Sequence, residues 1–243
     1  MIEGNNTVSG LLNEKIYSKG QAGFSDKNLL KIETIFALKE WINKNLSNGD
    51  ASGGQNIDMD IEINEVSESE LAKISFLKSS NKVLALVKIP KQELSLKRLT
   101  KQLSFVLDGI QDPGNLGSII RTAGWYGIDQ IICSRDCVDV YNPKVIQATK
   151  GSIAHVPVTY YSIPELMRKL KSIPIYGAVL NGNDIRNERL TKTGLIVLGN
   201  EANGISGTVL KYVNRPITIH RIGSGESLNV SVTAAVIADH FRR

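Results

Sequence analysis

Residues 223–241, GSGESLNVSVTAAVIADHF, join a loop of small polar residues to the start of an apolar helix. No apolar side chain occurs in residues 223–227, and Leu228 and Asn229 lead directly into an apolar run that continues almost to the C-terminus. Small polar loop atoms beside the start of a buried helix are typical of a ligand cradle. This segment therefore predicts one wall of a binding site.

Two upstream segments have the same character, and a regular alternation of strands and helices connects them to the C-terminal one. Residues 112–117 (DPGNLG) and 199–204 (GNEANG) each follow an apolar run that ends where the glycines begin. The apolar patterns predict strands at 104–108, 130–133, 175–179, 195–198 and 217–219, and helices at 116–126, 143–149, 163–170 and 229–241. This order predicts an α/β fold with a mostly parallel sheet. Because ligands bind beyond the carboxyl ends of such strands, we expect the three loops to form one site.

The first hundred residues have a different organisation. The patterns predict a strand at 31–38, a helix at 39–45 and a long loop at 45–56 without periodic apolar residues, followed by a strand at 57–63. Residues 82–90 are nearly continuous in Val, Leu and Ala, which predicts a strand covered on both faces. The polar stretch 91–101 is the expected interdomain linker. We therefore predict a small domain at 1–92 and a larger one at 101–243.

Composition excludes several classes of protein. With 42% hydrophobic and 22% charged residues, the chain is expected to bury an ordinary core. No apolar run approaches the ~20 residues that span a bilayer, and the N-terminus lacks signal-peptide features, so we expect a cytoplasmic protein without a membrane partner. The net charge is +5, and all of the basic excess lies in residues 101–243. Such an excess is compatible with a simple solvated surface and also with a polyanionic partner.

The chain has few residues suited to a metal site. Its two cysteines are Cys133 and Cys137, and its three histidines, His155, His220 and His240, lie elsewhere in the sequence. A pair of cysteines without a second ligand cluster does not predict a metal centre. Because Cys133 ends a predicted strand, we expect it to be a small buried core side chain.

The polar residues of the three loops each have a structural and a functional interpretation. Asn115 occupies a position suited to a helix N-cap, whereas Arg121, inside an apolar helix near a strand end, is suited to a phosphate or a carboxylate. Glu201 is either a capping carboxylate near Ser206 or part of a ligand site. Ser227 and Asn229 have similar alternatives, because each can cap the last helix or hold a substrate hydroxyl. The two glycines of residues 223–225 do not form a dinucleotide fingerprint, since the third glycine is missing and the loop comes at the end of the domain.

The three segments together resemble a known family. DPGNLGSIIRTA (112–123), LGNEANGIS (198–206) and IHRIGSGESLNVSVTAA (219–235) resemble, in order and spacing, the signature segments of the SpoU/TrmH family of ribose 2'-O-methyltransferases, in the SPOUT superfamily. The resemblance covers about residues 104–243. A weaker similarity at Glu3-Gly4 and at residues 66–90 is to the family's small RNA-binding domain, which is related to a ribosomal protein. The usual first helix and strand of that small domain are missing before Glu3.

The resemblance implies a fold, a reaction and partners. The expected fold is a parallel-sheet α/β knot with a C-terminal trefoil knot, preceded by the small α/β RNA-binding domain. The expected reaction is methylation of a ribose 2'-hydroxyl by S-adenosylmethionine, on rRNA rather than tRNA and not on DNA. An obligate homodimer with its active site at the subunit interface is also implied.

The resemblance also assigns roles to individual residues. Five residues would surround the reacting hydroxyl: Asn115, Arg121, Glu201, Ser227 and Asn229. Four would line the cofactor pocket: Leu198, Gly199, Ile219 and Leu228. Three would contact RNA: Arg121, Lys144 and Lys150. Two departures from the family pattern are His220-Arg221, where Pro-Met is usual, and Gln147, where an arginine is frequent.

Our hypothesis for the chemistry gives Arg121 the central role. Its guanidinium, with a pKa above ~12, is poorly suited to be a general base. We expect it to clamp a substrate phosphate and to stabilise developing alkoxide charge. Ser227 and Asn229 would orient the hydroxyl, and Glu201 would position Arg121 or its own loop. Two alternatives compete with this hypothesis: a catalytically inactive RNA-binding homologue, and a nucleotide-dependent oxidoreductase suggested by the α/β alternation.

Overall fold

The computed structural model describes residues 1–12, 30–46, 61–77, 81–91, 94–170 and 172–243. The chain divides into two compact units, Met1–Lys91 and Gln92–Arg243. Within the described ranges, no helix is long and apolar enough to cross a membrane.

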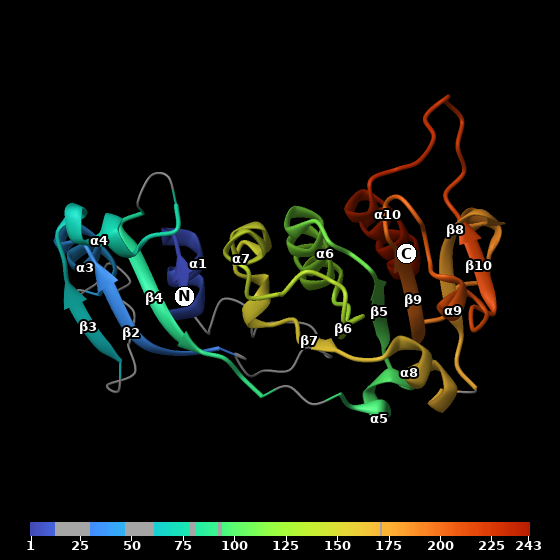
Figure 1. Ribbon diagram of the computed structural model, residues 1–243, viewed down its shortest axis with the longest axis horizontal. Helices are drawn as coiled ribbons and strands as arrows, with labels where there is room; N and C mark the ends of the chain where they lie inside the picture. Colours follow the sequence, from blue (N-terminus) through green and yellow to red (C-terminus); the bar gives the residue numbers. More distant parts are fainter. Residues whose placement is uncertain (13–29, 47–60, 78–80, 92–93, 171) are drawn as a thin grey trace. The chain divides into compact units, whose positions relative to one another are not determined.

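The first unit is a four-stranded sheet with short helices (Figure 1). The strands, in their order across the sheet, are β1 (Ile2–Glu3), β4 (Val83–Lys88), β2 (Lys31–Ala37) and β3 (Glu62–Glu65). β2 and β3 are parallel, whereas β4 runs antiparallel to both of its neighbours. The helices are α1 (Asn5–Leu12), α3 (Lys39–Leu46) and α4 (Glu68–Ile74). α4 starts with a capping box, in which Ser67 and Glu70 satisfy each other's backbone N–H groups.

The strand and helix predicted before residue 46 agree with the structure, and the elements predicted after it agree only in part. The strand at 31–38 and the helix at 39–45 are confirmed within one residue at each end. Most of the predicted loop at 45–56 lies outside the described residues, but Asn45 is helical. The first four residues of the predicted strand at 57–63 also lie outside the described residues, and the described strand begins at Glu62.

The expectation that residues 82–90 are covered on both faces is wrong for the second half of the strand. Val83, Leu84 and Ala85 are buried, whereas Leu86 is 39% exposed and Ile89 is 61% exposed. An apolar run by itself does not reveal where a covering helix stops, and this explains the difference.

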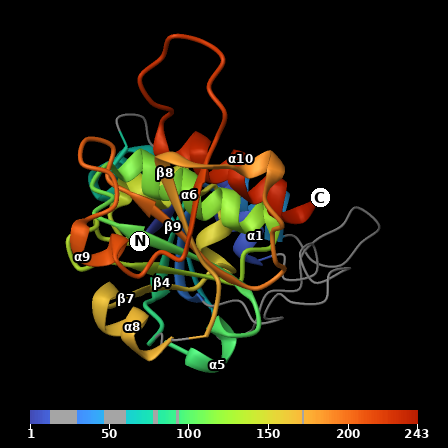
Figure 2. The same ribbon diagram turned by 90° about the vertical axis from the view of Figure 1, so that its right-hand side faces the viewer.

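The second unit contains a six-stranded parallel sheet (Figures 1 and 2). Its strands, in spatial order, are β10 (Arg215–Thr218), β8 (Ile175–Asp184), β9 (Gly194–Gly199), β5 (Leu103–Asp108), β6 (Gln130–Cys133) and β7 (Val158–Tyr160). All six residues of β5 are buried, as expected for a central strand of a parallel sheet. The predicted parallel α/β class is therefore confirmed.

Helices cover both faces of this sheet (Figure 2). They are α5 (Leu96–Leu99), α6 (Pro113–Tyr126), α7 (Pro143–Thr149), α8 (Ile163–Lys169), α9 (Gly207–Leu210) and α10 (Val230–Arg242), with 3-10 turns at Ser152–Ala154 and Ile185–Asn187. α5, α8 and α9 share one apolar core with alternate side chains of the central strands, such as Val106 and Val197. α6 packs against α7 and α10 on the opposite face.

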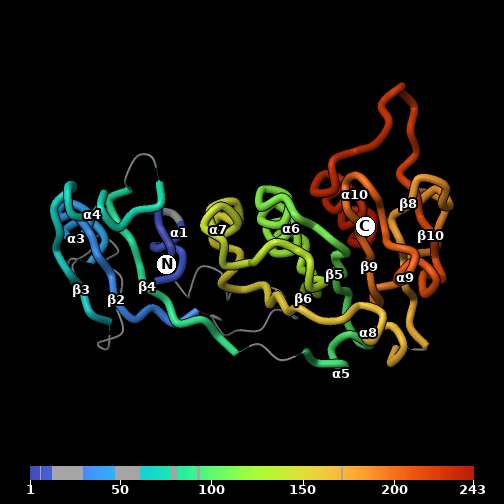
Figure 3. Tube along the Cα trace, in the orientation of Figure 1, coloured from blue at the N-terminus to red at the C-terminus, as the bar shows by residue number. Residues whose placement is uncertain are grey.

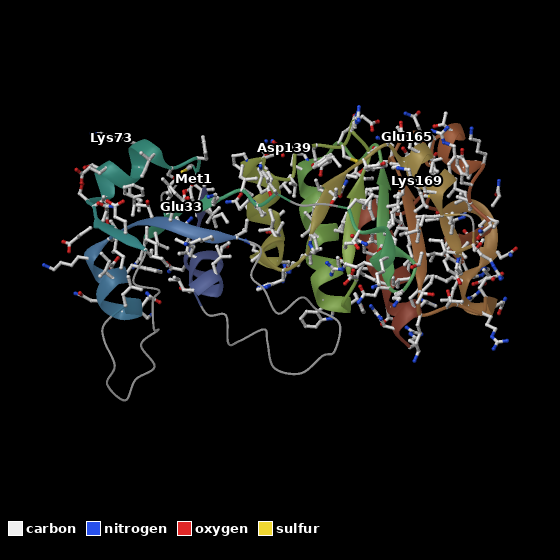
Figure 4. The ribbon with its side chains drawn as sticks, turned by 90° about the horizontal axis from the view of Figure 1, so that it is seen from below. Met1, Glu33, Lys73, Asp139, Glu165 and Lys169 are labelled. Atoms are coloured by element: carbon white, nitrogen blue, oxygen red, sulfur yellow. The ribbon has the colours of Figure 1, made fainter. Side chains whose placement is uncertain are left out.

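The amphipathic pattern of α8 illustrates how these helices are oriented. Ile163, Leu166 and Met167 are buried in the core, whereas Glu165 and Lys169 lie one turn apart on the solvent face (Figure 4). The Lys169 ammonium donates to the Tyr161 hydroxyl at 2.8 Å, which raises the pKa of that lysine. Apolar spacing therefore placed this helix correctly from the sequence.

Three details of this unit differ from the predictions. The predicted linker at 91–101 contains α5, whose Leu99 is fully buried in the core. Arg98 fixes α5 further by donating to both carboxylate oxygens of Asp129, at 2.9 and 2.7 Å. Two short elements, β7 and α9, were not predicted, because three or four residues are too few to establish a period. β8 is also five residues longer than predicted.

Both cysteines are buried, and the prediction for Cys133 is confirmed. Cys137 accepts from the Ile110 backbone N–H at 3.2 Å. Its pKa is lowered to about 7, mainly by a hydrogen bond with Cys133. Within the described ranges, no group of three or more His, Cys, Asp and Glu side chains is arranged to hold a metal ion.

Candidate functional site

The three glycine-bearing loops meet at the carboxyl ends of the parallel strands, as predicted. Asn115, on the first turn of α6, donates from its side-chain amide to the Glu201 carboxylate at 2.6 Å. Its amide oxygen accepts from the Asn229 side chain at 2.9 Å. One chain of hydrogen bonds, Asn229–Asn115–Glu201, therefore joins segments separated by as many as 114 residues.

The local structure differs from the predicted capping roles. Asp112, not Asn115, is the N-cap of α6, and its side chain accepts from the Asn115 backbone N–H at 2.8 Å. Pro113 occupies the first helical position, where a missing N–H has no cost, so the helix begins three residues earlier than expected. This shift frees the Asn115 side chain to reach across to the other loops.

Glu201 and Ser227 also differ from their capping interpretations. The carboxylate that accepts from the Ser206 backbone N–H, at 2.7 Å, belongs to Asp108 at the end of β5. Asn229 caps α10 by accepting from the Ser231 backbone N–H at 2.9 Å, as the capping interpretation of this residue predicts. Ser227 is exposed and forms no hydrogen bond with any described residue.

A cavity of about 950 Å³ lies beside this chain of hydrogen bonds. Its walls come from the end of β8, the 198–204 segment, the segment after β10 and the buried start of α10. All four residues predicted to hold the cofactor line it: Leu198, Gly199, Ile219 and Leu228. Their role in cofactor binding stays a prediction, but the structure brings them to one cavity that also includes Glu201, Ser227 and His220.

Glycine is required at one point of the cavity wall. A Cβ atom on Gly199 would lie 2.2 Å from the carbonyl carbon of Gly204 and 2.3 Å from the Ile205 nitrogen. Gly204 has a φ of +65°, which is the left-handed conformation that glycine adopts most readily. The 199–204 segment can thus turn tightly and present backbone atoms to the cavity.

Much of the rest of the wall is apolar and open to solvent. Several large apolar side chains line the cavity while remaining strongly exposed: Leu180 (73%), Ile222 (91%), Leu210 (43%) and Leu228 (52%). The segment 220–229 projects from the body of the unit between β10 and α10 (Figure 3). Sequence reasoning missed the β8 wall, because Leu180 lies in a strand extension that no apolar period indicated.

Charged groups surround the rim near His220. The His220 imidazole lies 3.8 Å from the Asp184 carboxylate. Arg186 donates to this carboxylate from its side chain and its backbone, and it holds the pKa of Asp184 at about 2. Arg221 donates to the Gly225 carbonyl at 3.0 Å, which closes the base of the projecting segment. The family departure at His220-Arg221 therefore adds an imidazole and a guanidinium to the residues that line the cavity.

The basic residues predicted to contact RNA are exposed, and they are not part of the Asn229–Asn115–Glu201 chain. Arg121 is exposed on α6 and has no hydrogen bond or ion pair with any described residue, Glu201 included. Lys144 lies exposed on α7, and Lys150 follows that helix in the left-handed conformation, with a φ of +50°. The suggestion that Glu201 positions Arg121 is therefore not supported within one chain, since Glu201 binds Asn115 instead.

Comparison with known proteins places this site in a family. Residues 102–239 match the model of the SpoU rRNA methylase family. The chain is 29% identical over 180 residues to the 23S rRNA (guanosine(2553)-2'-O)-methyltransferase RlmP of Bacillus subtilis, covering 73% of this chain and 71% of that protein. It is 30% identical over 172 residues to the 23S rRNA (guanosine-2'-O-)-methyltransferase RlmB of Neisseria meningitidis, covering 66% of this chain and 68% of that protein.

Solved structures agree with this assignment. A TrmH-family structure from Porphyromonas gingivalis superposes with a TM-score of 0.79 at 28% identity, covering 99% of this chain and 88% of that one. The SpoU methyltransferase AviRb from Streptomyces viridochromogenes, in complex with its cofactor AdoMet, shares the fold with a TM-score of 0.75 at 22% identity and the same two coverages. The chain belongs to the SpoU family of RNA methylases. This membership contradicts the oxidoreductase alternative.

Proposed function

We propose that this chain is an S-adenosylmethionine-dependent RNA methyltransferase that methylates a ribose 2'-hydroxyl of rRNA. The observation that carries the proposal is the chain of hydrogen bonds Asn229–Asn115–Glu201 beside a cavity with apolar and backbone walls. Membership of the SpoU family and the names of the RlmP and RlmB relatives support the reaction and the RNA class.

The cavity fits the proposed cofactor. Its volume of about 950 Å³ lies within the usual range for sites of small molecules and cofactors. Ile219 and Leu228 supply apolar surface for an adenine or a thioether, and the backbone around Leu198 and Gly199 supplies amides and carbonyls. When bound, the cofactor supplies an electrophilic methyl group. The protein must then hold a weakly nucleophilic ribose hydroxyl in line with it.

The polar residues suit the handling of this hydroxyl. Asn229 donates to Asn115, which in turn donates to Glu201, so both amides are held in place and can orient a hydroxyl without reorganising. Arg121 has no hydrogen bond or ion pair with any residue that the structure describes, so its guanidinium is available to clamp an RNA phosphate and to stabilise negative charge on the ribose oxygen. Ser227 likewise has no hydrogen-bond partner in the described part of the chain, and it is proposed to donate to or accept from the same hydroxyl.

The proposal extends to the assembly. We propose a homodimer in which Arg121 of one subunit acts close to the cavity of the other subunit. In support, the Arg121 side chain has no hydrogen bond or ion pair with a described residue of its own chain. Lys144, Lys150 and the first unit are proposed to contact RNA, and the cytoplasm is the proposed location because rRNA is found there. A trefoil knot in the C-terminal segment is also proposed. In support, α10 follows the edge strand β10 in sequence but packs against α6 and the more central strand β9.

The direct test is methyl transfer from radiolabelled S-adenosylmethionine to rRNA transcripts, with digestion to nucleosides to locate the label on the ribose. Isothermal titration measures cofactor binding separately. We expect transfer by the wild type, and cofactor binding with reduced transfer by N115A. Cofactor binding by the wild type without transfer to any RNA would favour the inactive RNA-binding homologue, and the absence of both would reject the proposal.

A further inference from the structure

The side chain of Asn200 ties the cavity wall to the end of the central strand β5. Its amide nitrogen donates to the Gly109 carbonyl at 2.8 Å. Its amide oxygen accepts from the backbone N–H groups of Ala202 at 2.9 Å and Asn203 at 3.2 Å. These bonds use both ends of the amide, so an isosteric carboxylate cannot replace it without losing a donor.

The backbone of Asn200 closes the same turn. Its N–H donates to the Gly204 carbonyl at 3.0 Å, and its own carbonyl accepts from the Gly204 N–H at 2.8 Å. Further along, the Asp108 carboxylate accepts from the Ser206 N–H. The loop 200–206 is therefore attached near both of its ends, to Asp108, the last residue of β5, and to Gly109, which follows it.

The attached loop carries Glu201, which is the next residue after Asn200. The Glu201 carboxylate accepts from Asn115 at 2.6 Å although it is exposed to solvent. An exposed side chain gains little from a single hydrogen bond unless its backbone is already fixed. Because Asn200 is half-buried and anchored, it provides the fixed backbone that Glu201 requires.

We infer that Asn200 is a positioning residue, which acts through Glu201 and sets the shape of the cofactor cavity by its hydrogen bond to the Gly109 carbonyl. This inference rests on the proposed function, since it assigns a role within that site. The sequence motifs assigned no role in the reaction or in cofactor binding to the side chain of Asn200. The hydrogen bond to Gly109, rather than the turn itself, is the part that transmits the effect.

Two variants separate the effect of the hydrogen bond to Gly109 from the effect of the turn at residues 200–204. N200D keeps an acceptor for Ala202 and Asn203 but places a carboxylate oxygen against the Gly109 carbonyl, whereas N200A removes all three side-chain bonds. We expect both variants to lower kcat roughly tenfold, as the loss of about one well-made hydrogen bond predicts. N187D is the charge-matched control, because the Asn187 side chain is exposed and has no hydrogen bond with a described residue. Wild-type kcat in N200D would overturn the inference, as would loss of thermal stability alone.

A double-mutant cycle tests whether Asn200 acts through Glu201. Single-turnover methyl transfer with excess enzyme is measured for N200D, E201A and the double variant. We expect N200D to change the rate less than about twofold once Glu201 is absent, because coupled residues are not additive. Full additivity would overturn the inference. If the wild type transfers no methyl group, the proposed function fails instead, and titration with S-adenosylmethionine still reports whether N200D alters the cavity.

Discussion

Two segments close the same cavity, but only one is held along its length. The 199–206 segment is anchored by Asn200 to Gly109 and by Ser206 to Asp108, and its glycines make a tight internal turn. The 220–229 segment is exposed throughout and is held near its ends, by the Asn229 bond to Asn115 and by His220 beside Asp184. The Arg221 bond to Gly225 is a tie within the segment itself. The chain has thus preformed one wall of the cavity and left the other open.

The difference shows which parts of the site precede the ligands. Preorganised groups can act on a substrate without reorganising, whereas unattached groups gain their order from the ligand that binds them. Asn115, Glu201 and Asn229 belong to the first group, because they bind one another. Arg121 and Ser227 belong to the second, because they have no partner among the described residues. We expect substitutions in the two groups to differ in their effects on stability.

The largest effect is expected for Arg121, in the unattached group. R121A should lower kcat by roughly 10²–10³-fold, the usual loss when one donor to a developing oxyanion is removed. Stability and cofactor affinity should stay close to wild type, because the Arg121 side chain has no bond to lose within the described ranges. Methyl transfer, thermal unfolding and cofactor titration are measured together, with R121K to separate charge from bidentate geometry. Unchanged turnover in R121A would remove Arg121 from the proposed machinery.

The next effect tests whether the anchored wall is rigid. G199A places a Cβ 2.2 Å from the Gly204 backbone, so we expect a loss of roughly 1–3 kcal/mol in unfolding free energy and at least tenfold weaker cofactor binding. G223A is the matched control for stability, since a Cβ there meets nothing within 4 Å. Denaturant unfolding measures both variants. Equal stability of G199A and G223A would mean that the two segments are equally adaptable.

A smaller effect should come from the far end of α10. The Arg242 side chain donates to the Tyr126 carbonyl at 2.7 Å and to the Gly127 carbonyl, and these carbonyls end α6. R242A should lower the unfolding free energy by about 1 kcal/mol. R243A removes an exposed pair with Asp239 and should cost less than about 0.5 kcal/mol. If R242A has no effect, the two Arg242 hydrogen bonds add nothing to the packing of the buried α10 side chains, such as Ala234 and Ile237.

The smallest effect is expected at Ile222. I222S should change stability by less than about 0.5 kcal/mol, because the side chain is 91% exposed. If the 220–229 segment folds over the cofactor, Ile222 becomes partly buried. The variant should then bind cofactor up to roughly fivefold more weakly, because less apolar surface is buried. Titration of both proteins with S-adenosylmethionine measures this. Equal affinities would indicate that the open segment stays open when the cofactor binds.

Much of the site was predictable because its signals are local. Glycines that directly follow apolar strands located the three loops, and the rule for parallel sheets placed them at one edge. The capping roles were less predictable. Asn115 and Glu201 each have a short-range capping interpretation, but a longer-range bond between the two decided their contacts. A capping propensity describes only the neighbouring backbone, so it cannot anticipate a bond across more than 80 residues.

The order of residues was sufficient to establish the α/β class, the main strands and helices, and the family to which the chain belongs. Apolar periodicity and glycine position are properties of short segments, and they persist whatever the rest of the chain does. The tertiary structure decided that the Asn200 side chain binds the Gly109 carbonyl and that Asn115 links Glu201 to Asn229. It also decided that the Arg121 guanidinium has no partner among the described residues. These outcomes depend on distances between segments far apart in sequence, which only packing of the sheet and its helices determines.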